Sequence, residues 1–174
     1  TRMAPEPETK DWTWVLREPC PDCGFDASAY PPPALPAVLA DLTDRWRVVL
    51  TRPDVRDRPD EATWSPLEYA AHARDVCRVL RGRLERILTE DRPTLANWDQ
   101  DATAVTDRYQ EQDPATVAGE LAEAARAAGQ AFAAAPPEQW ARVGVREDGA
   151  EFTVVTLGQY LVHELRHHLH DVAG

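Results

Sequence analysis

Apolar residues recur at intervals of three and four along four long segments of this chain, and this feature constrains its fold most strongly. The segments run from Ala34 to about residue 50, from Pro66 to about Glu90, from Pro114 to about residue 135, and from about Thr156 to the end. This spacing places apolar side chains on one face of a helix, so each segment predicts an amphipathic helix. Four such helices without an internal repeat predict an all-α protein built as a four-helix bundle.

Two of these segments begin with strong helix-start signals. Ser65 precedes Pro66, and Glu68 follows where a capping box needs it, while Asp113-Pro114 repeats the order of cap and proline. Helices should therefore begin at residues 66 and 114.

The rest of the chain has no helical period. Residues 1–33 are rich in proline and tryptophan and predict an irregular arm, followed by the bundle over residues 34–174. Asp148-Gly149 and the β-rich run 152–155 indicate a short β-hairpin before the last helix. We expect Trp12, Trp14 and the turn at Cys20 and Cys23 to pack over one end of the bundle and to bound its pocket.

The charge of the chain restricts its partners. Thirty acidic against nineteen basic residues give a formal net charge of −11, so the phosphates of nucleic acids would mostly be repelled. No apolar run approaches the roughly 18 residues of a membrane span, and no signal-peptide pattern is seen. These features predict a cytoplasmic protein that binds neither nucleic acid nor membranes.

Three cysteines are too few for a paired disulfide scaffold in a chain of 174 residues. Cys20 and Cys23 have the spacing of a zinc knuckle, which supplies two thiolate ligands. A complete site would have to recruit Cys77 or a histidine such as His168. A reversible disulfide and a plain turn are the alternatives, and the sequence leaves all three open.

The histidines are distributed unevenly. Four of the five lie within eight residues near the C-terminus, and His72 stands alone. His163 and His167 are one helical turn apart and therefore project side by side, which is a minimal clamp for a divalent metal. His72 could supply a third ligand and leave an open coordination position for chemistry. His168 and His170 are interpreted as mainly structural or supporting residues.

Two other interpretations compete for these histidines. A His pair near a helix C-terminus also favours the helix dipole and can simply be solvated. His163-Glu164-x-x-His167 also matches the zinc-protease motif in which the glutamate is the general base. Such proteases take a third ligand downstream and set the motif against a sheet. Only seven residues follow His167, so the protease interpretation is disfavoured.

Several short motifs, in this order, resemble the DinB-like superfamily over about residues 34–174. They are Trp64-Ser65-Pro66, His72 with Asp75, Arg92-Pro93-Thr94-Leu95, the acidic positions Asp99 and Asp101, and His163-x-x-x-His167. The resemblance implies an up-down-down-up four-helix bundle with a divalent metal, commonly zinc or nickel. By position, the implied ligands are His72, His163 and His167.

The resemblance also implies an activity, because actinobacterial members look like mycothiol-dependent enzymes. We therefore expect a metal-dependent thiol S-transferase that joins a low-molecular-weight thiol to a small electrophile, in a monomer or homodimer. Tyr160, Glu164 and His170 are the candidate catalytic residues, and Arg78 is the candidate for binding the thiol cofactor. The alternatives are a metal-binding stress-response or ligand-binding module without turnover, and a metal-dependent hydrolase or isomerase.

Overall fold

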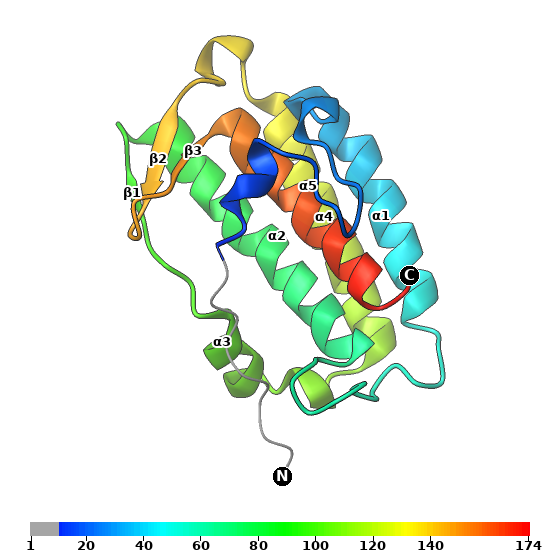
Figure 1. Ribbon diagram of the computed structural model, residues 1–174. Coiled ribbons are helices and arrows are strands. Elements are labelled where there is room, and N and C mark those ends of the chain that lie inside the picture. Colours follow the sequence, from blue (N-terminus) through cyan, green and yellow to red (C-terminus); the bar gives the residue numbers. More distant parts are fainter. Residues whose placement is uncertain (1–10) are drawn as a thin grey trace.

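A computed structural model describes residues 11–174, and five α-helices form most of this part of the chain (Figure 1). Their bounds are α1 Leu35–Val49, α2 Pro66–Thr89, α3 Gln100–Thr106, α4 Pro114–Ala134 and α5 Val154–Asp171. Three short strands complete the regular structure, namely β1 Thr94–Leu95, β2 Val143–Arg146 and β3 Glu151–Thr153.

The four long helices pack as a bundle in which α1 and α2 each contact both α4 and α5. In Figure 1, α1 and α5 run in one direction while α2 and α4 run in the other, which is an up-down-down-up arrangement. The predicted all-α four-helix bundle is thus confirmed. The α2–α4 pair is parallel, so the connection between these helices must return along the length of the bundle.

That connection contains two elements that the sequence did not predict. The first is β1, which pairs in parallel with β2, while β2 and β3 form the predicted antiparallel hairpin. The predicted β-run over 152–155 ends earlier, at Thr153, because the Thr153 side chain caps α5, which begins at Val154 and not near Thr156. The second is α3, whose first turn is capped by the Asp99 side chain accepting from Ala102 N. At seven residues, α3 is too short to show an apolar period.

The start signal of α2 forms as predicted. Ser65 accepts a hydrogen bond from Glu68 N, and the Glu68 carboxylate accepts one from Ser65 N. Glu68 also accepts two hydrogen bonds from Arg58, at 2.8 and 2.7 Å. Burial tends to raise the pKa of Glu68, but the bonds to Arg58 and Ser65 hold it below its usual value. The capping carboxylate is therefore charged and paired.

Residues 11–34 lie along α5 as 3-10 turns and loops (Figure 1). Val15, Cys20 and Phe25 are buried, so this segment is part of the core. Arg166 of α5 anchors it by donating hydrogen bonds to Cys23 O and Tyr30 Oη. The first ten residues of the predicted arm lie outside the described part of the chain.

The helices of residues 11–174 include none with the length and apolar character that crossing a membrane would demand.

A glycine in α5 sets how closely this helix approaches its neighbours. A Cβ at Gly158 would lie 2.9 Å from Leu35 Cδ2 and 3.2 Å from Phe132 Cδ1. We expect Gly158→Ala to lower the free energy of unfolding by about 1–2 kcal/mol, because overpacking outweighs the gain in helix propensity. Chemical denaturation of the purified variant measures this change.

Gly119→Ala on α4 is the matched control, because a Cβ there would meet no atom within 4 Å. It should raise the free energy of unfolding by about 0.5–1 kcal/mol. Equal effects of the two substitutions would contradict the close approach at Gly158.

Candidate functional site

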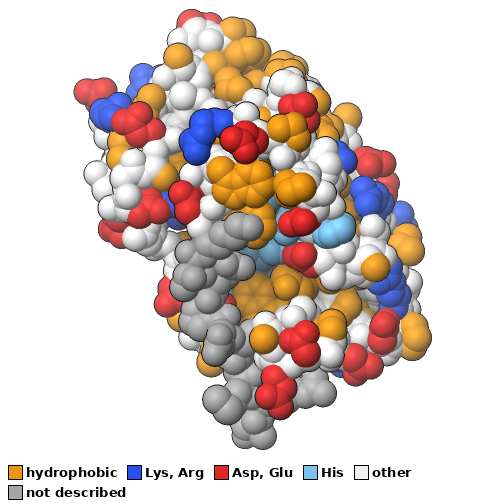
Figure 2. Space-filling view, in the orientation of Figure 1, with side chains coloured by type: hydrophobic (Ala, Val, Ile, Leu, Met, Phe, Trp, Pro, Cys, Tyr) orange, Lys and Arg blue, Asp and Glu red, His pale blue; other side chains and the backbone are white. Residues whose placement is uncertain are grey.

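Helix α5 carries two adjacent rows of potential ligands. Residues four apart lie above one another, so His163 and His167 form one row, and Glu164 with His168 forms the next, rotated by about 100°. Two clusters of potential metal ligands occur among residues 11–174, and each takes one of these rows. Figure 2 shows histidine surface between hydrophobic and acidic side chains on this face of the molecule.

The first cluster joins helices α2 and α5 and contains His72, Glu164 and His168. Each offers one ligand atom, and these atoms lie within 4.8 Å of one another. Glu164 Oε2 lies 3.4 Å from His72 Nε2 and 3.2 Å from His168 Nε2. Two imidazoles and one carboxylate are a ligand set used by catalytic zinc sites that keep a position open.

Aromatic side chains hold both imidazoles of this cluster. The Trp98 ring stacks on His72 with centroids 5.6 Å apart and an interplanar angle of 4°, while Trp64 packs on His72 at 5.3 Å. Tyr69 packs on His168 with centroids 4.9 Å apart. These contacts fix the ring planes and restrict the access of water to the ligands.

The protonation states of the cluster follow from burial and contacts. Burial lowers the pKa of His72, so its imidazole is neutral. Burial alone would raise the pKa of Glu164, yet contacts with His168 and His72 hold it well below its ordinary value. Partial burial alone would lower the pKa of His168, but its hydrogen bonds to Asp171 and Glu164 raise this pKa to about 9. A metal ion at its Nε2 would displace the proton there.

The residues of this cluster fit a divalent metal. His72 is 1% exposed; its Nδ1 has no hydrogen-bond partner within residues 11–174, and its Nε2 has only Glu164 Oε2 nearby, at 3.4 Å. Leaving a buried polar atom unpaired costs about 1–3 kcal/mol, and a metal ion would satisfy it. His168 Nδ1 lies 2.9 Å from Asp171 Oδ2, and such a carboxylate orients a ligand whose Nε2 binds the metal.

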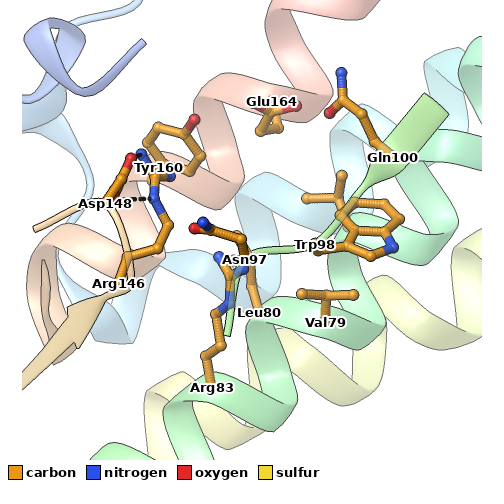
Figure 3. A pocket seen from close by; sticks show the side chains of 11 residues that line it. Val79, Leu80, Arg83, Asn97, Trp98, Gln100, Arg146, Asp148, Tyr160 and Glu164 are labelled. Atoms are coloured by element: carbon orange, nitrogen blue, oxygen red, sulfur yellow. Dashed lines mark hydrogen bonds and ion pairs between the residues drawn. The ribbon is translucent and has the colours of Figure 1, made fainter. Parts of the chain in front are cut away.

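A pocket with a volume of about 280 Å³ adjoins this cluster (Figure 3). Its walls come from α2, from the segment leading into α3, from the β2–β3 hairpin and from α5. The lining residues are Val76, Val79, Leu80, Arg83, Asn97, Trp98, Gln100, Arg146, Asp148, Tyr160 and Glu164. Glu164 thus belongs both to the pocket wall and to the ligand cluster, and Trp98 lines the pocket and stacks on His72.

The polar groups of the pocket have distinct roles. Arg146 donates hydrogen bonds of 2.9 and 2.7 Å to Asp148, which neutralises its charge. Arg83 donates a hydrogen bond to Ala96 O at 2.8 Å. Unlike Arg146, it forms no ion pair with a carboxylate among the described contacts. Burial raises the pKa of Tyr160, so its hydroxyl stays protonated and can donate a hydrogen bond. These groups suit a small molecule that carries a polar or anionic end.

The second cluster contains Cys20, Cys23, His163 and His167, with one ligand atom of each within 4.8 Å of the others. The predicted metal ligands are therefore divided: His72 lies with Glu164 and His168, whereas His163 and His167 lie with the two cysteines. The site of three histidines stays a prediction, and the structure offers another set around His72.

The predicted catalytic and cofactor residues lie in different surroundings. Tyr160 and Glu164 line the pocket. His170 is exposed on the last turn of α5, and Arg78 pairs with Asp75 and Glu120 without lining the pocket. The arm residues expected to bound the pocket are also absent from its lining and pack on α5 instead.

Sequence reasoning missed several residues of the site. His168 was interpreted as supporting, and Trp98, Arg83 and Arg146 were not proposed as pocket residues. The one available signal was the spacing of Glu164 and His168, which repeats the spacing of His163 and His167. Nothing in the sequence indicated that residues 97–100 and 146–148 meet across the pocket.

Comparison with known proteins supports the fold assignment. YfiT from Bacillus subtilis, described as a probable metal-dependent hydrolase with an unusual four-helix bundle topology, superposes with a TM-score of 0.71. The match covers 80% of this chain and 83% of YfiT at 18% sequence identity. A search of curated proteins finds no significant match. The family model of the DinB superfamily matches residues 34–172. The chain therefore belongs to the DinB superfamily.

Proposed function

We propose that this protein is a divalent-metal-dependent enzyme whose metal is bound by His72, Glu164 and His168. The observation that carries the proposal is the position of Glu164, which belongs to the ligand cluster and also lines the pocket. Three protein ligands leave a coordination position open, and the pocket gives a small molecule access to the cluster. This arrangement favours catalysis over a closed structural site.

The residues of the chain would bind and orient the substrate. Arg83 would bind an anionic or polar end, since its guanidinium lacks a carboxylate partner among the described contacts. Tyr160 would donate a hydrogen bond from its protonated hydroxyl. Trp98 covers His72 and forms one wall, so it would exclude water from the ligand side of the pocket.

The reaction we propose is transfer of a low-molecular-weight thiol of the mycothiol type to a small electrophile. A divalent metal such as zinc or nickel would supply Lewis acidity and lower the pKa of a nucleophile at its open position. The resemblance to mycothiol-dependent members of the superfamily supports the thiol as that nucleophile. Glu164, held ionised, would keep its place as a ligand throughout.

Hydrolysis is the second candidate, and the ligand set favours it. Two histidines and one glutamate are the protein ligands in zinc hydrolases of the thermolysin type. YfiT, which has the same fold, is itself described as a probable metal-dependent hydrolase. The two candidates share the metal site and differ in the nucleophile.

The metal site predicts the effect of removing a ligand. His72→Ala and Glu164→Gln should each lower kcat/KM by about a hundredfold or more, because each removes one of three protein ligands. The assay loads the protein with zinc or nickel and supplies a chromogenic electrophile with mycothiol or, in a parallel series, an activated ester without thiol. Turnover only with thiol supports the transferase, and turnover of the ester supports the hydrolase.

Glu123→Gln, an exposed carboxylate on α4, is the control and should leave kcat/KM unchanged. Full activity in a folded His72→Ala protein would refute the proposed metal site. No turnover in either series, with metal bound, would support a binding module instead.

The pocket predicts a separate role for Arg83. Arg83→Ala should raise KM about tenfold, which corresponds to about 1.4 kcal/mol, with a smaller change in kcat, because the guanidinium binds the substrate away from the reacting atoms. Steady-state kinetics measures this split. Arg81→Ala, which removes an exposed arginine of the same helix, should leave KM unchanged. A similar rise in both variants would point to a general charge effect.

A further inference from the structure

Cys20 and Cys23 lie beside the row of α5 that carries His163 and His167, next to the row that belongs to the His72 cluster. Cys20 Sγ lies 3.6 Å from His167 Nδ1. The ligand atoms of Cys20, Cys23, His163 and His167 all lie within 4.8 Å of one another, as four ligands around a single small ion require. Cys77, the other cysteine considered as a ligand, is buried on α2 and belongs to neither cluster.

The turn between the two cysteines is tight and closed by backbone hydrogen bonds. Gly24 N donates to Cys20 O at 2.9 Å, and Cys20 N donates to Phe25 O at 2.9 Å. Gly24 has a φ of +70°, which a residue with a side chain rarely adopts. Arg166 of α5 donates to Cys23 O at 3.0 Å, so the helix that carries the histidines also holds the turn.

The buried histidine of this cluster lacks a partner. His163 is 1% exposed, and neither of its ring nitrogens makes a hydrogen bond to any residue in 11–174. Phe25 and Trp12 pack against its ring with centroids 5.2 and 5.6 Å away, so the imidazole is held in an apolar environment. A buried imidazole whose nitrogens make no hydrogen bond, next to two cysteine side chains, is suited to binding a metal ion.

The outer contacts of the cluster also match those of a metal site. His167 directs Nδ1 to Cys20 and its other nitrogen, Nε2, to Asp171 Oδ1 at 3.7 Å. A carboxylate beside the second ring nitrogen is the common arrangement around metal-bound histidines. Cys20 and His167 are 1% and 7% exposed, so an ion there would be shielded from solvent.

We infer that Cys20, Cys23, His163 and His167 form a structural zinc site that fastens residues 11–34 to α5. Two thiolates and two imidazoles in C-x2-C and H-x3-H spacing are a tetrahedral zinc ligand set, and four protein ligands close the coordination sphere. Binding releases the two thiol protons to solvent. The site is separate from the cluster around His72, which has three ligands and adjoins the pocket.

The test measures zinc in the full chain purified under reducing conditions and then incubated with zinc alone. The wild-type protein should bind zinc at this site. Cys23→Ser should contain one zinc ion fewer per chain than the wild type, because it loses this ion. His72→Ala should keep the ion that Cys23→Ser loses. Cys77→Ser is the matched control and should bind as much zinc as the wild type. Retention in His72→Ala together with loss in Cys23→Ser separates this site from the proposed catalytic one.

A second measurement does not depend on any variant. Cobalt substituted into the wild-type protein should show the intense near-ultraviolet charge-transfer absorption of thiolate ligands, which ligation by histidine and glutamate does not produce. A folded wild-type protein that binds no thiolate-ligated cobalt, or that contains a disulfide between Cys20 and Cys23 under reducing conditions, would overturn the inference.

Discussion

Buried imidazoles on the last helix, and one opposite it, are the physical constraint that both candidate metal sites share. α5 packs against α1, α2 and the arm, so several of its faces lie in the interior. His163 and His167 are buried on this helix, and His72 is buried opposite it. Helices in a bundle normally bury leucine at such positions, because an imidazole without a partner is costly. A metal ion at each cluster would satisfy these imidazoles. One ion would cross-link α5 to α2, and the other would cross-link α5 to the arm.

Asp171 connects the two clusters. Its Oδ1 faces Nε2 of His167 and its Oδ2 lies 2.9 Å from Nδ1 of His168, so one carboxylate contacts a histidine in each row. The same contacts hold the pKa of Asp171 below its usual value against the opposing effect of burial. A shift of the last turn of α5 would therefore change both clusters together. The arm, although absent from the pocket lining, is thus linked to His168 by successive contacts from Cys20 through His167 and Asp171.

The bundle can be predicted from the sequence, but the grouping of the metal ligands into two clusters cannot. Helix periodicity and the capping signals at Ser65 and Asp113 are local, and the structure confirms them. Ligand choice on α5 depends on which of two adjacent rows, about 100° apart, faces α2. That angle is set by packing such as Trp46 Nε1 donating to Leu165 O at 3.2 Å, which no spacing reveals. Cys20 and His167 are 147 residues apart in the sequence, so no local pattern predicts their contact either.

The charge of the pocket differs from that of the whole molecule, and this difference bears on the substrate. The chain carries a net charge of −11, which would repel anions at long range. Within the pocket, Arg146 and Asp148 neutralise each other, while Glu164 faces His72 and His168. With a divalent ion on that cluster, the ion and Arg83 would leave the pocket positive. A small anion, or a thiol that becomes one, would therefore gain most of its binding energy inside the pocket and little from the surrounding surface.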